Sequence, residues 1–398
     1  MPHRLRIGLA RLTLAILLVL SPGSGRTASA QEIAGQVQET FDSLTKLITA
    51  AAYLDGLGFA VDAILKFKSH KDNPTQTPIG TPIALAAAAA ALLFLPSVLD
   101  VGSSTTMSGS SAPLSASLSC PVFVGEGTLL GEDRCVWAKA GPRWTEQSGS
   151  SAQGGTYRAG GQAEIAPEWF LGGAIGAGNQ TTQSFGITSR SQTFDASLSL
   201  KRTAGPWLFA AAAAFTANST QTSGIPSLQL GDVTSNAYGG GLRVRGAYDF
   251  AFTGWYVRPR LDLDLVHRCM PGFQVVSQGT TLLSVSDFAK TSFVATPTVE
   301  VGGRYDIPST RMILRPYAAV GASFQPDNTS TVNAQFAGPL ATLGGFQASV
   351  NNPTVLANVE AGLQLYRSSS VELKAEYTLT TGYSYLSQAA GLRGAWHF

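Results

Sequence analysis

Side chains that could carry out chemistry are few in this sequence. The four histidines are His3, His70, His267 and His397. Asp262, Asp264 and His267 come nearest to an acid–base group. However, Arg258, Arg260 and the two aspartates occupy every second position, so they would lie on one face of a strand, which indicates ion pairs. No HExxH motif, nucleophile elbow or phosphate-binding loop is present. We therefore expect no catalytic residues, no metal, no cofactor and no enzymatic activity.

The three cysteines indicate a disulfide instead of a metal site. Cys120 and Cys135 flank a short glycine-rich segment, and Cys269 is left over. None has a second cysteine or a histidine at ligand spacing. A bridge between Cys120 and Cys135 would contribute about 3 kcal/mol in the chain-entropy model. We predict this disulfide for a chain that leaves the cytoplasm.

The start of the sequence predicts such export. Arg4, Arg6 and Arg11 precede the apolar run "LTLAILLVL", and Ala28-Ser29-Ala30 offers a small-residue cleavage site. This pattern is typical of a secretory signal peptide over residues 1–30. The alternative is an N-terminal anchor helix, but the run is short for a membrane span.

The composition favours apolar residues interleaved with polar ones. Charged residues make up 13% of the 398 residues, about half the usual share, and the mean hydropathy is only +0.12. A net charge of +2 gives no reason to expect nucleic acid as a partner.

The mature chain divides into three parts. Residues 31–102 predict a module of two hydrophobic helices, because apolar residues recur at helical spacing and "IALAAAAAALLFLPSVL" contains no charge. Whether these helices lie in a membrane stays open. Residues 103–119 form a Ser/Gly-rich linker with too few apolar residues to pack. Residues 120–398 predict β-structure.

From about residue 134 the hydrophobic period is 2. In "GWYVRPRLDLDLVHR", charged and apolar residues alternate from Val257 to Leu265, so they occupy opposite faces of a strand. Either a soluble antiparallel sheet or a transmembrane barrel gives this pattern. Three observations favour the barrel: the segments have ten or more residues, short and long connections alternate regularly, and aromatic residues lie near the segment ends. These aromatic residues are Trp137, Trp144, Trp169, Trp207, Trp255, Tyr256, Tyr383, Tyr385 and Trp396. We predict an all-β transmembrane barrel of about twelve antiparallel, up-and-down strands.

The polar positions of these strands predict a hydrated or plugged lumen. The charges expected to face it are Arg158, Glu164, Arg243, Arg245, Arg258, Arg260, Asp262, Asp264, Glu300, Arg304, Glu360, Glu372, Lys374, Glu376 and Arg393. Their mixed signs are not typical of a selective pore.

The last strand is expected to pair with the first, which leaves no edge in lipid. Leu392, Trp396 and Phe398 share one parity, and a terminal aromatic after such a row looks like the signal read by the barrel-assembly machinery. Outer-membrane lipid and this machinery are therefore the expected partners.

Residues 130–398 resemble the autotransporter β-domain. The resemblance lies in "CVWAKAGPRW", "AEIAPEWFLGGAIGAG" and the closing "LKAEYTLTTGYSYLSQAAGLRGAWHF", in this order. It implies a twelve-stranded barrel in a bacterial outer membrane. In that family the segment before the barrel threads the lumen and carries a passenger outward.

Residues 31–102 are similar to a different family, IcmD (DotP), a component of Dot/Icm type IVB secretion systems. "FKSHKDNPTQTPIGTPIAL" followed by "LLFLPS" carries this resemblance. It implies an envelope location and a role in effector export. The sequence thus leaves three functions open: an autotransporter-type barrel that anchors or translocates its short N-terminal module, a type IVB envelope component tethered by the barrel to other secretion-system proteins, and a passive channel.

Overall fold

The computed structural model describes residues 66, 68–69, 113–115, 120–147, 149–184, 187–223, 232–277, 279–309, 312–327, 329–367 and 371–398. All belong to one compact unit, Asp55–Phe398. The predicted signal peptide and nearly all of the predicted helical module lie outside these residues. Of that module Lys66, Lys68 and Ser69 are described, and all three are helical where the sequence predicted a polar break. No helix among the described residues is long and apolar enough to cross a bilayer.

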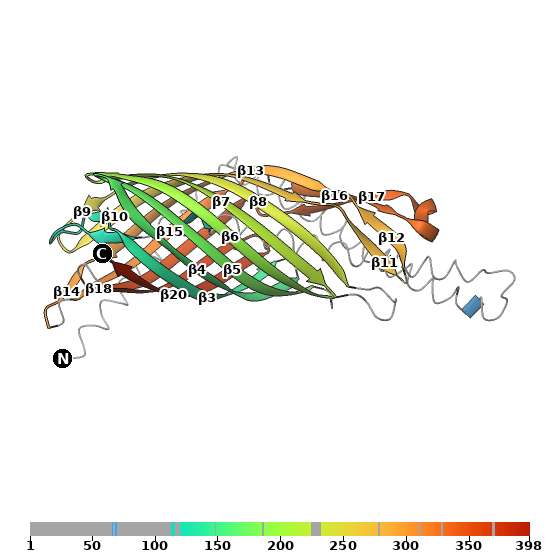
Figure 1. The fold of residues 1–398 in the computed structure, drawn as a ribbon, viewed down its shortest axis with the longest axis horizontal. Coiled ribbons are helices and arrows are strands. Elements are labelled where there is room, and N and C mark those ends of the chain that lie inside the picture. The colour runs from blue at the N-terminus through green and yellow to red at the C-terminus, as the bar shows by residue number, and fades with distance from the viewer. Residues whose placement is uncertain are drawn as a thin grey trace, which may run out of the picture. The chain divides into compact units, whose positions relative to one another are not determined.

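Twelve long antiparallel strands form a closed barrel (Figure 1). They are β3 (Cys135–Gln147), β4 (Ser150–Ala166), β5 (Trp169–Ser184), β6 (Ile187–Ala204), β7 (Trp207–Thr222), β8 (Val233–Tyr248), β10 (Trp255–Met270), β13 (Phe288–Gly303), β15 (Met312–Phe324), β18 (Val355–Arg367), β19 (Val371–Gly382) and β20 (Tyr385–His397). The predicted strand number and the up-and-down order are confirmed, whereas the predicted two-helix module finds no support in the described residues.

Two pairings close the ring. Strand β20 pairs with β3 from Tyr385↔Gln147 to His397↔Cys135, and β13 pairs with β15. The last strand therefore joins the first, as the sequence predicted. No barrel strand is left with an unpaired edge.

The outer surface of the wall is apolar and the inner surface is polar. On β10, Leu261, Leu263 and Leu265 are 44%, 37% and 48% exposed, whereas Asp262 and Asp264 are buried. A soluble barrel would place its leucines inside, so this arrangement excludes the soluble alternative.

Aromatic residues mark two levels of the outer surface. On β7, exposed Trp207 and Phe215 are eight residues apart. At about 3.3 Å per residue and a tilt of about 45°, they are separated by roughly 19 Å along the barrel axis, close to the apolar band of a membrane barrel. Three other aromatic residues were wrongly expected at the membrane interface, because Trp137, Tyr256 and Tyr385 are buried and face inward.

The two ends of the barrel differ. Short turns, together with β9 (Phe250–Ala251) and β14 (Tyr305–Ile307), form what we call the short-turn mouth, at the left of Figure 1. Long connections at the other end build a four-stranded sheet that extends beyond the barrel. Its members are β11 (Phe273–Ser277), β12 (Thr280–Val285), β16 (Thr329–Phe336) and β17 (Gly345–Asn351), with the 3-10 helix η2 (Gly338–Leu343) between the last two. Leu283, Val285 and Phe336 belong to its hydrophobic core.

Candidate functional site in the barrel lumen

A small β-hairpin precedes the first barrel strand. It consists of β1 (Pro121–Phe123) and β2 (Leu130–Glu132), which pair antiparallel. Phe123 donates its backbone N–H to Tyr366 Oη on β18, and Glu132 contacts Lys201 on β6. In the ring of twelve strands β6 and β18 are six positions apart in either direction, so they stand opposite one another. The hairpin therefore spans the short-turn mouth from wall to wall.

Hydrogen bonds hold the hairpin at this mouth. Arg304 Nη1 donates to the carbonyl oxygens of Gly125 and Gly127, at 2.7 and 2.8 Å, and its guanidinium lies over the Phe123 ring. Thr128 Oγ1 donates to the carbonyl of Phe252 at 2.8 Å. Arg304 and Phe252 lie in different connections of the barrel, so the hairpin can leave the mouth only if both sets of bonds break.

A second group of polar contacts holds the end of the hairpin. Gln162 Nε2 donates to Glu132 Oε2 at 2.9 Å and to the Asp133 carbonyl at 2.6 Å. His397 Nδ1 lies 3.1 Å from Asp133 Oδ2. Lys201 is only 1% exposed, so its charge depends on Glu132 for compensation.

The disulfide lies at the base of the same hairpin. Cys120 and Cys135 are bonded, and Cys269 is free. Because Cys120 comes just before β1 and Cys135 is the first residue of β3, the bond ties the start of the hairpin directly to the barrel wall. The Arg393 guanidinium lies against both sulfur atoms, at 3.4 and 3.8 Å.

Above the hairpin, carboxylates and guanidinium groups pair across neighbouring strands. Arg243 binds Asp264 through Nε and Nη2, at 2.6 and 2.7 Å. Arg245 binds Asp262 in the same bidentate way, with both distances 2.7 Å. Such paired contacts are stronger than single hydrogen bonds and fix both groups in one orientation. These four residues were predicted to face the lumen, and the structure places them there.

A buried network surrounds Arg315, which the sequence analysis missed. Arg315 donates to Glu300 at 2.5 Å, to Tyr256 Oη at 2.7 Å and to Gln364 at 2.6 Å. Tyr256 in turn donates to Glu300 at 2.6 Å. All four side chains are buried, so removing Arg315 would leave the Glu300 carboxylate buried without the cation that it binds.

The remaining predicted charges pair in the same part of the lumen. Arg258 binds Asp249, Arg158 binds Asp195, and Glu376 contacts both Lys139 and Lys374. Glu372 accepts from Arg393 at 2.7 Å and lies 3.0 Å from His397 Nε2. Glu360 accepts from Tyr317 Oη at 3.0 Å.

Two predicted lumenal charges lie elsewhere. Glu164 continues the inward alternation of β4, but it is exposed at the β4–β5 turn and accepts from the Glu168 backbone. Arg304 holds the hairpin at the mouth instead of lining the interior.

Sequence reasoning omitted several cations and acids of the lumen: Glu132, Lys139, Arg143, Asp195, Lys201, Asp249, Arg268, Arg315 and His397. The alternation itself marks Asp195, Lys201 and Arg315, but nothing marks Glu132.

The expected linker also enters the lumen. Leu114 is fully buried and packs on Ala210 and Ala212, and Ser115 Oγ contacts Arg243. The expectation that residues 103–119 are too polar to pack is therefore wrong at Leu114. A single leucine suffices here because small alanines on β7 leave room for it.

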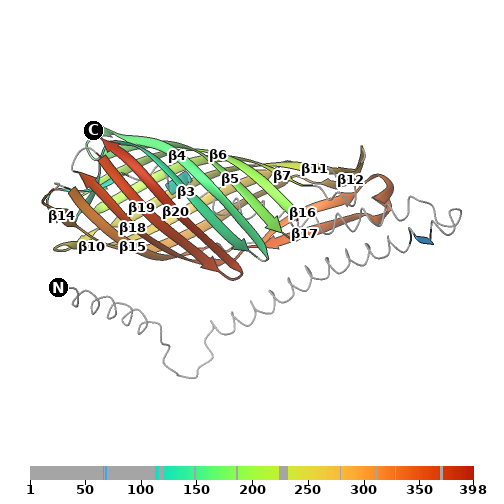
Figure 2. The ribbon, with the colours of Figure 1, turned by 90° about the horizontal axis from the view of Figure 1, so that it is seen from below.

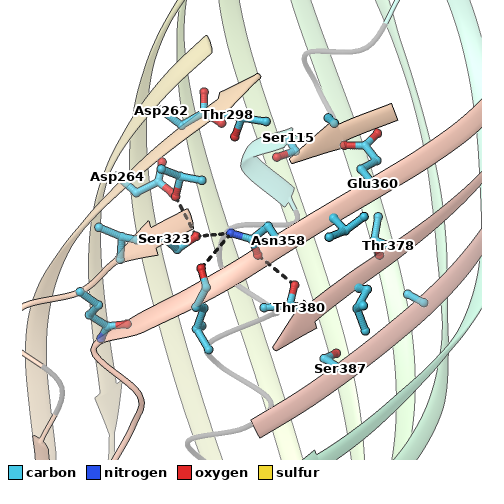
Figure 3. A pocket seen from close by; sticks show the side chains of 18 of the residues that line it. Ser115, Asp262, Asp264, Thr298, Ser323, Asn358, Glu360, Thr378, Thr380 and Ser387 are labelled. Carbon is cyan, nitrogen blue, oxygen red and sulfur yellow. Dashed lines mark hydrogen bonds between the residues drawn. The ribbon is translucent and has the colours of Figure 1, made fainter. Parts of the chain in front are cut away.

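Two cavities remain, and Ser115 and Arg143 line both. The lower cavity, about 310 Å³, is bounded by Pro121 and Glu132 of the hairpin. The upper cavity, about 300 Å³, extends from Ser115 to Gln325 and Ser387 near the long-loop end. Figure 3 shows its wall, where Asn358 donates to Ser323 and accepts from Thr380.

The acid–base group that came nearest in the sequence does not assemble. His267 Nδ1 lies 2.8 Å from Thr291 Oγ1, away from Asp262 and Asp264, which are held by arginines. The described residues contain no cluster of metal-binding side chains. Leu392, Trp396 and Phe398 are all exposed on the outer face of β20 or just after it.

The closed twelve-stranded wall, its outer apolar face and its filled lumen define an outer-membrane β-barrel. The autotransporter β-domain family model matches residues 136–378, more than half of the chain. The protein therefore belongs to the autotransporter β-domain family, and its barrel is a translocator domain of this type.

A solved structure shows the same fold. The translocator domain of autotransporter NalP from Neisseria meningitidis is 12% identical, with a TM-score of 0.52 over 67% of this chain and 89% of that one. The β domain of the Bordetella autotransporter BrkA is 16% identical, with a TM-score of 0.47 over 67% of this chain and 100% of the other. No curated protein sequence matches this chain. The IcmD (DotP) resemblance falls on residues 31–102, nearly all outside the described residues, and the family match begins after them.

Proposed function

We propose that this barrel anchors and translocates the short segment that precedes it, has no enzymatic activity, and closes behind that segment with its hairpin. The observation that carries this proposal is the path of the chain. Leu114 and Ser115 lie inside the lumen, and a few residues later Cys120 begins the hairpin at the short-turn mouth. A chain that runs along the lumen before joining the first strand is suited to present its upstream part at the other end.

The lumen walls suit a chain of low charge. Almost every lumenal carboxylate is already held by an arginine or lysine of the wall, so a passing segment finds few uncompensated carboxylates. Residues 73–112 contain one charged residue, Asp100. Moving these residues through the lumen therefore costs little desolvation free energy, because the segment has almost no charge to take out of water.

Assembly of the barrel involves its outer face. Leu392, Trp396 and Phe398 form an exposed apolar row, which supports recognition by the barrel-assembly machinery and contact with outer-membrane lipid. Replacing Phe398 with serine is expected to lower the amount of heat-modifiable barrel in the outer membrane.

Surface proteolysis of intact cells tests the proposal. An epitope tag is placed directly after Ala30, and the heat-dependent gel mobility of the barrel reports folding. We expect the tag to be lost while the barrel stays folded. A tag that stays protected in cells with a folded barrel would refute surface presentation and favour the alternative, in which the module remains in the envelope with type IVB secretion proteins.

A further inference from the structure

The charges lining the two cavities do not balance. In the lower cavity Arg158, Arg245, Arg258, Arg315 and Arg393 each have a carboxylate partner at hydrogen-bond distance. Lys139 and Lys374 share Glu376. Each of these cations therefore has a carboxylate of the protein at hydrogen-bond distance.

Two arginines are not compensated in this way. Arg143 lines both cavities and has no ion pair with a described carboxylate. Arg260 also lines both, and its nearest carboxylate oxygen, Asp262 Oδ2, is 4.0 Å away. That carboxylate is already bound by Arg245, and Arg260 Nε is buried without a hydrogen-bond partner among the described residues. The guanidinium of Arg260 thus retains unused donor capacity.

The acids of the upper cavity make their shortest contacts with other groups. Asp262 and Asp264 are each held by two hydrogen bonds from Arg245 and Arg243. Glu360 accepts from Tyr317. Apart from Arg268, the rest of the polar lining consists of neutral hydroxyl and amide groups, as Figure 3 shows for Thr298, Ser323 and Asn358. Such groups can donate to an anion without repelling it.

We infer that the meeting point of the two cavities binds a small oxyanion, of the phosphate, sulfate or carboxylate class, between Arg143 and Arg260. The planar guanidinium fork suits such groups because it donates two parallel N–H groups to two oxygens. A cavity of about 300 Å³ is large enough for an anion of this size. Since the hairpin closes the short-turn mouth, the anion enters from the long-loop end.

Calorimetric titration of the full-length protein in detergent with inorganic phosphate tests this site. We expect saturable binding, which sulfate displaces. Arg143→Gln should weaken binding about tenfold or more, because it removes charge-assisted hydrogen bonds to the anion. The control is Arg190→Gln, which removes an exposed arginine near the long-loop end and should leave the affinity unchanged.

Heat-dependent mobility shows whether each variant folds. If Arg143→Gln does not fold, Arg260→Gln takes its place in the same titration. Absence of saturable binding by the unmodified protein would overturn the inference, as would equal affinities of the unmodified protein and a folded lumenal variant. Failure here leaves the surface-proteolysis result unaffected, so the two proposals are separable.

Discussion

The lower and upper halves of the lumen are built on different electrostatic principles. In the lower half every guanidinium group except Arg143 and Arg260, which line both cavities, has a carboxylate partner at hydrogen-bond distance. A disulfide-linked hairpin closes the mouth of this half (Figure 2 shows the barrel from the side of β3 and β20). In the upper half Arg143 has no such partner, and the wall combines the Arg243–Asp264 and Arg245–Asp262 pairs with many neutral hydroxyl and amide groups. Paired buried charges are rigid and costly to break, whereas an unpaired arginine in a hydrated cavity is free to bind solutes. The lower half thus seals the barrel, and the upper half stays accessible.

Removing the hairpin should give the largest effect, because it removes the element that distinguishes the closed lower half from the accessible upper half. Deletion of residues 121–132 eliminates every contact across the short-turn mouth. We expect stable conductance in planar bilayers where the full chain gives almost none. Deletion of Gly338–Leu343 at the other end is the control and should leave the barrel closed. Conductance from the intact chain equal to that of the hairpin deletion would contradict the seal.

Replacing one arginine in each half should change the free energy of unfolding by different amounts. Arg315→Leu leaves Glu300 buried without its partner, so we expect a loss of about 3–5 kcal/mol in the free energy of unfolding. Arg143→Leu leaves no carboxylate unpaired and should change stability by less than about 1 kcal/mol. Urea unfolding in detergent micelles measures both. Similar losses for the two variants would refute the distinction.

Opening the disulfide should weaken the seal by a smaller amount. With Cys120 and Cys135 both changed to serine, the closed loop loses a stabilisation of about 3 kcal/mol in the chain-entropy model. We expect brief channel openings in bilayer recordings, and the same openings when the unmodified protein is treated with a reductant. Cys269→Ser is the matched control, because this thiol is free. Recordings that stay silent after reduction would show that the non-covalent contacts suffice.

The smallest predicted effect concerns the packing that supports the lower network. A Cβ on Gly302 would collide with the ring of Tyr256, whereas one on Gly246 would meet no heavy atom within 4 Å. Gly302→Ala should therefore destabilise the barrel by about 1–3 kcal/mol through overpacking. Gly246→Ala should not. Unfolding midpoints of the two variants measure the difference, and equal midpoints would argue against close packing around Tyr256.

The wall of this barrel could be predicted from sequence because it depends on local alternation. Each residue's parity fixes its face, so Leu261 and Asp262 were placed correctly without knowledge of any neighbouring strand. The same rule failed for Trp137, Tyr256 and Tyr385, which were assigned to interface belts by residue type although their parity points inward.

The contents of the lumen could not be predicted in the same way. Pairs such as Arg315 with Glu300 depend on the register between neighbouring strands, which parity alone leaves open. Glu132 lies in a short glycine-rich segment that resembles a loop, and its partner Lys201 is 69 residues further on. Contacts across the full width of a closed barrel leave no periodic trace in the sequence.

The disulfide also determines how mechanical load passes through the molecule. Shear on a segment outside the cell would pull on the chain at Ser115 and then at Cys120. From there the force travels through the sulfur–sulfur bond into Cys135 and the barrel wall, bypassing β1 and β2. The hairpin is therefore unloaded, and its hydrogen bonds are not pulled apart one after another. Such a barrel can hold a tethered segment under tension without leaking.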